Sequence, residues 1–205
     1  MPLNLPNILT VTRIVVIFVS LGLANFGKLP DGSMPAPGDF AMVMRYIAYA
    51  LAILAGITDH IDGFLARKWN QITDFGALMD PLADKIFVTA AMVILVDYQL
   101  LPAWIAAVVI SREFLVTGLR LVAIRQGRVI SADRWGKLKT VSQMVMLLFA
   151  GLIWIDLLPM GRSLFGAVSV AWIWRVLLWI VVVITIGSGC GYFYKNRDLV
   201  SGTGK

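Results

Sequence analysis

The sequence predicts an all-α integral membrane protein with six transmembrane helices. Of its 205 residues, 59% are hydrophobic, and the mean hydropathy is +0.82. A helix needs about 20 mainly apolar residues to cross the hydrocarbon core of a bilayer. Runs of about that length follow one another at residues 8–25, 43–65, 82–97, 102–122, 139–157 and 168–192. They leave no separate soluble domain, so we expect residues 1–205 to form a single membrane domain.

The first three runs differ in how they begin and in what connects them. The run 8–25 carries Arg13 near its start and lacks an A-x-A-like cleavage site, so we interpret it as a retained helix and not as a signal peptide. The connection from Asn25 to Phe40 contains Gly, Pro, Asp and Ser without periodicity, which predicts an irregular outer loop. Pro81 precedes the third run and is expected either to kink that helix or to begin it.

The last three runs each carry a polar or small-residue feature. Arg112 lies inside the apolar run 102–122, where an unpaired charge would be costly. The fifth run begins at Lys139, directly after a basic segment. The sixth contains Gly187 and Gly191 in a G-x-x-x-G spacing, which could pack two helices within a subunit or between subunits.

Basic residues set the expected orientation in the membrane. With the N-terminus inside, the outer loops hold only Lys28 and Arg162. The polar inner segments 66–81 and 123–140 should hold the active surface, so we expect both termini and the active site to be cytoplasmic. The net charge of +6 then reflects topology and contact with anionic lipids, and we expect no nucleic-acid partner. The inner basic residues are Arg13, Arg67, Lys68, Arg125, Arg128, Arg134, Lys137, Lys139, Lys195, Arg197 and Lys205.

Two carboxylate pairs lie where a membrane protein should avoid charge. Asp59 and Asp62 are three residues apart, and Asp80 and Asp84 are four apart, so each pair lies on one face of a helix. An Asp at the centre of a bilayer costs roughly 2.5 to 3.5 kcal/mol, and four acids close together would also repel one another. Two Mg²⁺ or Mn²⁺ ions would compensate them, because these ions prefer carboxylate oxygens and can clamp a phosphoryl group.

The acids belong to a longer pattern, D-x-x-D-G-x-x-A-R-x8-G-x3-D-x3-D, from Asp59 to Asp84. This pattern resembles the signature of the CDP-alcohol phosphotransferase family. The segments 6–13, 83–85, 111–114 and 136–140 are similar to the bacterial branch of that family that makes phosphatidylglycerophosphate. The similarity therefore covers most of the chain, although these four segments are less specific than the acidic signature.

The resemblance implies an enzyme of phospholipid biosynthesis in the bacterial cytoplasmic (inner) membrane, acting as a homodimer. It implies transfer of a phosphatidyl group from CDP-diacylglycerol to glycerol 3-phosphate, with release of CMP and use of two divalent metal ions. In this interpretation Asp59, Asp62 and Asp80 bind metal, while Asp84 also faces the metals and acts as the catalytic base. The residues expected to bind CDP-diacylglycerol are Asn7, Thr10, Asp59, Asp62, Gly63, Arg67 and Thr73.

Four cations are expected to bind the phosphate of the acceptor, namely Arg112, Arg120, Lys137 and Lys139. Such a cluster favours glycerol 3-phosphate over a neutral alcohol. Other interpretations stay open: the two lysines could be a basic membrane flank, and Arg112 could pair structurally with Glu113. Likewise, Asn7 and Thr73 could cap helices and Arg13 could be an interfacial anchor.

Three further functions compete with this hypothesis. A related enzyme could use inositol phosphate, serine or a second lipid as its acceptor. An ion-coupled transporter would also place acids in membrane helices, but here the acids cluster toward the cytoplasmic ends and the outer half has no matching polar series. A non-catalytic lipid-binding protein would have no need of the complete acidic signature.

Overall fold

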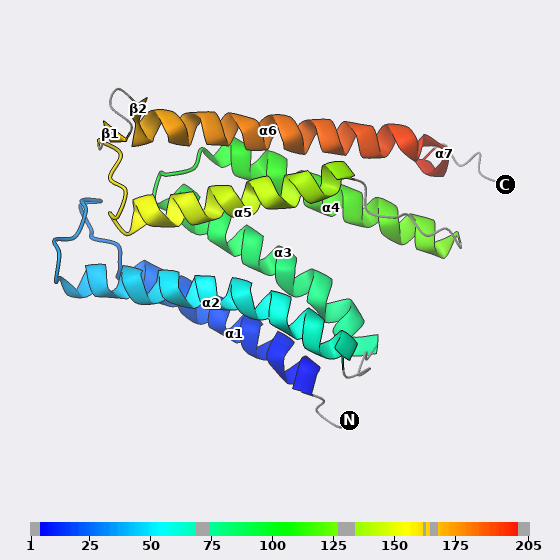
Figure 1. Ribbon diagram of the computed structural model, residues 1–205, viewed down its shortest axis with the longest axis horizontal. Coiled ribbons are helices and arrows are strands. Elements are labelled where there is room, and N and C mark those ends of the chain that lie inside the picture. The colour runs from blue at the N-terminus through cyan, green and yellow to red at the C-terminus, as the bar shows by residue number, and fades with distance from the viewer. Residues whose placement is uncertain (1–4, 69–73, 127–133, 162, 165–167, 201–205) are drawn as a thin grey trace. The chain divides into compact units, whose positions relative to one another are not determined.

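The structure, a computed structural model, describes the backbone of residues 5–68, 74–126, 134–161, 163–164 and 168–200. Within these ranges, the side chains of residues 5–7, 9, 59–68, 74–81, 125, 134, 163–164, 168 and 199–200 lie outside the description. The described chain forms six long helices, one single-turn helix and one pair of two-residue strands (Figure 1). These elements are α1 (Leu5–Phe26), α2 (Phe40–Lys68), α3 (Asp74–Asp97), α4 (Ala103–Arg125), α5 (Arg134–Trp154), β1 (Ser163–Leu164), β2 (Val168–Ser169), α6 (Val170–Lys195) and α7 (Arg197–Val200).

Each of the six apolar runs corresponds to one long helix, but the bounds of the helices differ from those of the runs. The third helix begins at Asp74, eight residues before its apolar run, so Pro81 lies inside α3 and does not begin it. The fifth helix begins at Arg134, five residues before its apolar run. Both helices can begin before their apolar runs because helix formation requires backbone hydrogen bonds and not apolar side chains. The all-α expectation also needs a small correction, since Ser163 and Ser169 face each other in the antiparallel β1–β2 pair.

Three helical segments of the described chain are long and apolar enough to cross a membrane by length and composition. They are Phe40–Thr58, Trp135–Trp154 and Val170–Lys195, whereas the apolar part of α1, Thr10–Phe26, is shorter. Large apolar side chains are exposed on these helices, including Val183 at 65%. Exposed apolar helix faces are what lipid contact requires. The protein is therefore a membrane protein, while the number of six spans stays a prediction.

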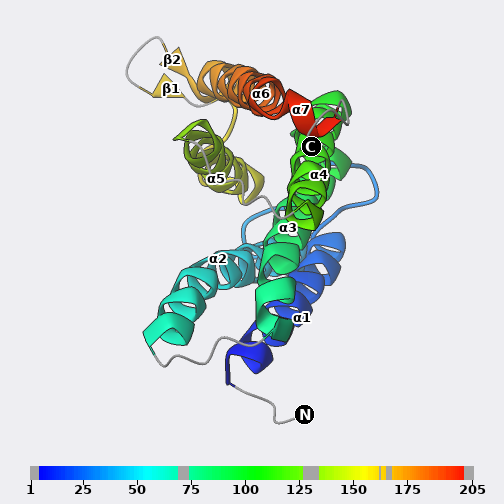
Figure 2. The same ribbon diagram turned by 90° about the vertical axis from the view of Figure 1, so that its right-hand side faces the viewer.

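The chain divides into two compact units, residues 1–100 and 101–205. In unit 1, α1 packs on both α2 and α3. In unit 2, α6 packs on both α4 and α5 (Figure 2). Fully buried side chains such as Met92 in unit 1 and Met146 in unit 2 mark the two interiors. The single domain expected over the whole chain stays a prediction.

Local hydrogen bonds explain where several helices end. Beyond α3, Gln99 adopts a left-handed φ of 57°, and the N–H of Leu100 donates to the carbonyl of Leu95 at 2.9 Å. Asp156 follows α5 with a φ of 59°, and the N–H of Leu157 returns to Leu152 in the same way. Both ends are Schellman-type caps, in which a residue of positive φ stops the helix. This cap ends α5 at Trp154, before the predicted end at residue 157.

The irregular loop between α1 and α2 is organised by two acids. The backbone N–H and the hydroxyl of Ser33 both donate to Asp31, at 3.0 and 2.8 Å. Both hydrogen bonds lower the pKa of Asp31 below its usual value, and the bond from the Ser33 backbone has the larger effect. Asp39 accepts from the N–H of Ala36 at 2.9 Å. The predicted loop is therefore confirmed as irregular in path, but its turns are set by specific hydrogen bonds.

A polar cluster at the loop end of unit 1 ties its three helices together. The buried Arg45 of α2 donates from Nε to the carbonyl of Gly27 at 2.7 Å. Its guanidinium lies over the ring of Tyr98, 4.8 Å from the centroid. The Tyr98 hydroxyl in turn donates to the carbonyl of Ala24 at 2.6 Å. One arginine and one tyrosine thus connect the end of α1, the first turns of α2 and the end of α3.

Gly27 should be intolerant of a side chain, because a Cβ there would lie 2.6 Å from Cγ of Arg45 and 3.2 Å from two backbone oxygens. We expect Gly27→Ala to lower the free energy of unfolding of detergent-solubilised protein by about 1–3 kcal/mol. Gly22→Ala is the matched control on α1, since a Cβ at Gly22 meets nothing within 4 Å. It should be neutral or slightly stabilising. Equal thermal stability of the two variants would contradict the conclusion that close packing of Arg45 against Gly27 stabilises unit 1.

Candidate functional site

The four acids of the signature lie on two consecutive helices of unit 1. Asp59 and Asp62 belong to α2, and Asp80 and Asp84 belong to α3. Asp62 is six residues before the end of α2 and Asp80 six residues after the start of α3, so each lies about 9 Å along its helix from the connection. The backbone therefore confirms that each pair shares one helix at the spacing that puts it on one face.

The side chains of most signature residues fall outside the description. Asp84 is described and exposed, whereas the side chains of Asp59, Asp62, Gly63, Arg67, Thr73 and Asp80 are not described, nor is that of Asn7. Among the described residues, no group of three or more His, Cys, Asp or Glu side chains could hold a metal ion. The metal site, whose predicted ligands are almost all outside that set, stays a prediction. The fit of the four acids to such a metal ion rests on the oxygen chemistry of their carboxylates and on the helical spacing within each pair.

Two polar residues of α1 point into unit 1. Thr10 is 1% exposed and Arg13 is 4% exposed, while Val11 and Val15 between and beyond them are exposed. Because Arg13 is buried, its interpretation as an interfacial anchor is wrong: a snorkelling arginine would keep its guanidinium in water. The role of Thr10 in binding CDP-diacylglycerol stays a prediction.

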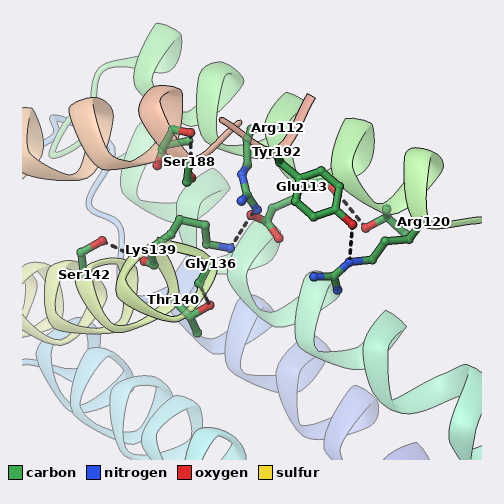
Figure 3. Close-up of polar contacts among 11 residues, drawn as sticks. Arg112, Glu113, Arg120, Gly136, Lys139, Thr140, Ser142, Ser188 and Tyr192 are labelled. Carbon is green, nitrogen blue, oxygen red and sulfur yellow. Dashed lines mark hydrogen bonds and ion pairs between the residues drawn. The ribbon is translucent and has the colours of Figure 1, made fainter. Parts of the chain in front are cut away.

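Three charged residues of unit 2 form what we call the Glu113 cluster: Arg112 and Glu113 of α4 and Lys139 of α5 (Figure 3). Nη1 of Arg112 donates to Oε1 of Glu113 at 3.3 Å, and Nζ of Lys139 donates to the same oxygen. The side chains are 13%, 19% and 7% exposed. The pairing of Arg112 with Glu113 is therefore confirmed, with Lys139 as a second partner from another helix.

The three described side chains of the Glu113 cluster, one carboxylate and two cations, sum to one positive charge. Without that carboxylate, Arg112 and Lys139 would be two like charges with little access to water. Nε of Arg112 is buried and has no hydrogen-bond partner among the described residues. A buried N–H without an acceptor is costly in an apolar interior.

Gly189 of α6 lets the Glu113 cluster form beside that helix. A Cβ at Gly189 would lie 3.2 Å from Cγ of Arg112, which is tighter than ordinary packing. Gly187 and Gly191, by contrast, are exposed, and a Cβ at either meets nothing within 4 Å. The middle glycine of this segment therefore serves packing within the unit, while the G-x-x-x-G pair faces outward.

Arg120 lies two turns further along α4 and is held by a residue that the sequence analysis did not single out. Its Nε donates to the hydroxyl of Tyr192 of α6 at 3.1 Å, and its guanidinium carbon is 5.7 Å from the centre of the same ring. Figure 3 shows this contact on the same side of α4 as Glu113. A single tyrosine thus provides both a hydrogen bond and a cation–π contact.

The two lysines expected to bind the acceptor phosphate, Lys137 and Lys139, differ in their exposure to solvent. Lys139 is buried within the Glu113 cluster, whereas Lys137 is exposed. Residues two apart on a helix point about 200° from each other, so both cannot face the same partner. Burial argues against a purely membrane-flank role for Lys139. For Lys137 the flank interpretation stays open beside the predicted acceptor role.

Comparison with known proteins gives the family. The family model CDP-alcohol phosphatidyltransferase matches residues 3–187, which includes the acidic signature and the Glu113 cluster. The chain belongs to this family. The match begins just before α1 and ends within α6, so the family pattern extends over both units. The resemblance of the acidic signature to this family is thereby confirmed.

Relatives of the family from several bacteria match most of the chain. The CDP-diacylglycerol–glycerol-3-phosphate 3-phosphatidyltransferase of Bacillus subtilis is 42% identical over 198 residues, covering 95% of this chain and 96% of the relative. The Haemophilus influenzae protein of the same name is 39% identical over 161 residues, covering 75% and 77%. A probable phosphatidylglycerophosphate synthase of Mycobacterium tuberculosis is 38% identical over 178 residues, covering 87% and 77%.

Glu113 should stabilise unit 2 far more than an exposed ion pair stabilises unit 1. We expect Glu113→Gln to lower the free energy of unfolding by about 3 kcal/mol, because Arg112 and Lys139 would lose their shared counter-charge. The matched control is Asp97→Asn, which removes a carboxylate 2.6 Å from Lys28 where the side chains are 37% and 52% exposed. That change should cost less than about 1 kcal/mol. Thermal unfolding in detergent measures both, and equal losses would contradict the compensating role of Glu113.

Proposed function

We propose that this protein transfers the phosphatidyl group of CDP-diacylglycerol to glycerol 3-phosphate, giving phosphatidylglycerophosphate and CMP in phospholipid biosynthesis. The observation that carries the proposal is the 42% identity to the Bacillus subtilis enzyme over 95% of this chain. Two further relatives with the same activity in their names match 75% and 93% of this chain. The acidic signature and the Glu113 cluster supply the residue chemistry that such a transfer needs.

The acidic signature is the proposed site for the donor and for two divalent ions. Asp59, Asp62, Asp80 and Asp84 are the proposed ligands of Mg²⁺ or Mn²⁺. When bound, the ions would neutralise the charge of the donor's diphosphate. Gly63 leaves room for close approach of the diphosphate, and the planar fork of Arg67 suits phosphate oxygens. Asn7, Thr10 and Thr73 complete the residues proposed to bind the CDP portion.

The Glu113 cluster is the proposed site for the phosphate of the acceptor. Two considerations support it: the three described side chains of the cluster sum to one positive charge, and Nε of Arg112 has no acceptor among the described residues. A phosphate oxygen would accept that N–H, and an arginine fork binds phosphate in a bidentate manner. Arg120 and Lys137 are proposed to add positive charge at the cytoplasmic side. A neutral alcohol would gain nothing from these cations, which is why glycerol 3-phosphate is the proposed acceptor.

The proposed chemistry is a direct displacement at the phosphorus that bears the diacylglycerol. The hydroxyl oxygen of glycerol 3-phosphate forms a bond to this phosphorus while the bond to the CMP oxygen breaks. Asp84 takes the hydroxyl proton as general base, and CMP leaves with the electron pair of the broken bond. The sequence motifs single out no Ser, Cys or His as a covalent nucleophile. The proposed transfer therefore proceeds in one step.

The proposed location is the bacterial cytoplasmic membrane, with six spans and with both termini and the active site on the cytoplasmic side. This proposal rests on the excess of Lys and Arg in the segments assigned to the inside. A homodimer is proposed from family resemblance, and the mass of the detergent-solubilised particle decides it. The outward Gly187 and Gly191 are compatible with such an assembly.

Purified protein should release CMP from CDP-diacylglycerol only when glycerol 3-phosphate and a divalent ion are both present. Asp84→Asn should lower this release by at least about 10²-fold, because the base is lost. Mn²⁺ binding measured by calorimetry should be largely kept, because the three other acids remain and Asn keeps a neutral group of similar shape facing the metals. Asp80→Asn should lose both release and Mn²⁺ binding. Equal loss of Mn²⁺ binding in the two variants would contradict the assignment of Asp84 as the general base, because Asp84 would then act only as a metal ligand.

The same assay identifies the acceptor. Inositol phosphate, serine and a second lipid, each supplied in place of glycerol 3-phosphate, should give no CMP above background. Release with one of them and not with glycerol 3-phosphate would assign the chain to another acceptor branch of the family.

The topology predicts opposite accessibility of two serines. In a Cys190→Ala background, Ser33→Cys should react with a membrane-impermeant thiol reagent in intact cells, because Ser33 lies in the exposed loop assigned to the outside. Ser201→Cys, beyond the described residues, should react only after the membrane is permeabilised. Labelling of Ser201→Cys from outside would overturn the cytoplasmic location of the C-terminus.

A further inference from the structure

The last turns of α6 present a tyrosine whose position is determined by the core of unit 2. Tyr192 is 7% exposed, and its ring belongs to a buried cluster with Val116, Leu119 and Ala123 of α4. Its carbonyl accepts a hydrogen bond from Nδ2 of Asn196 at 2.8 Å, at the C-terminal cap of the helix. Ring and backbone of Tyr192 are thus both held in place, which leaves the hydroxyl at a defined point beside α4.

That hydroxyl determines how one arginine of α4 is oriented. Arg120 donates from Nε to the Tyr192 oxygen at 3.1 Å, and the guanidinium carbon lies 5.7 Å from the ring centre. With Nε engaged, the two terminal nitrogens of the guanidinium form the edge that remains for a ligand. This edge matches the spacing of two phosphate oxygens.

We propose that Tyr192 is a positioning residue for acceptor binding, which holds the Arg120 guanidinium with its terminal edge presented to the phosphate of the acceptor. The inference rests on the proposed function, because it assumes an acceptor that carries phosphate. A free arginine samples many rotamers and loses that freedom on binding, whereas an arginine already held by Tyr192 loses less. The advantage should appear in the affinity for the acceptor and not in the chemical step.

A second tyrosine on the same helix provides a matched control. Tyr194 is 72% exposed, and the guanidinium carbon of Arg197 lies 5.4 Å from its ring centre. It is therefore also a tyrosine beside an arginine, two residues from Tyr192, but it points outward. Removing one hydroxyl from each ring compares the same chemical change at a buried and at an exposed position.

The test is steady-state kinetics of the full-length protein in detergent with each substrate varied in turn. Tyr192→Phe keeps the ring in the core and removes only the hydroxyl. It should raise KM for glycerol 3-phosphate about three- to tenfold, the effect of one hydrogen bond, with kcat and KM for CDP-diacylglycerol unchanged. Tyr194→Phe should leave all three constants unchanged. An equal rise in both KM values, or a fall in kcat alone, would overturn the positioning role.

Variants of Arg120 separate failure of this inference from failure of the proposed function. Arg120→Ala should raise KM for glycerol 3-phosphate, and adding Tyr192→Phe to it should have no further effect, because the tyrosine acts through the arginine. A further rise in the double variant, or an effect of Arg120→Ala without one of Tyr192→Phe, would overturn the inference alone. Absence of glycerol 3-phosphate-dependent CMP release from the unaltered protein would instead overturn the proposed function.

Discussion

Compensation of charge among apolar helices is the constraint on which the rest of this protein depends. Water cannot solvate an ion in a bilayer core, so each charged side chain there needs a partner from the protein, a metal ion or a substrate. In unit 2 Glu113 meets this need by bridging Arg112 and Lys139 across two helices. The three described side chains sum to one positive charge, which supports the proposed affinity of the unit for an anionic acceptor.

The same constraint links helix packing to recognition. The close approach of α6 to α4 is allowed by Gly189, beside the stem of Arg112, and is continued by the apolar contacts of Tyr192. In unit 1 the buried Arg45 and Tyr98 connect three helices at the loop end, away from the helix ends that carry the acidic signature. A site for phosphoryl transfer needs such support, because small errors in the position of a catalytic group are costly.

Helical periodicity and residue chemistry determined much of this protein before any tertiary information. Six apolar runs predicted six helices, and the spacings of Asp59 to Asp62 and of Asp80 to Asp84 placed each pair on one helix. The limits of the helices were less predictable. The start of α3 at Asp74 and the end of α5 before Asp156 depend on backbone hydrogen bonds and on a residue of positive φ, which apolarity does not encode.

The sequence by itself determined the family, the membrane character and the type of chemistry, because these depend on residue types at short, regular spacings. Only the tertiary structure decided that Lys139 is buried while Lys137 is exposed, and that Glu113 serves two cations. It alone brought Tyr192 to Arg120, which lies 72 residues earlier in the chain. Pairings between distant segments depend on which helix faces meet, and no local periodicity specifies that choice.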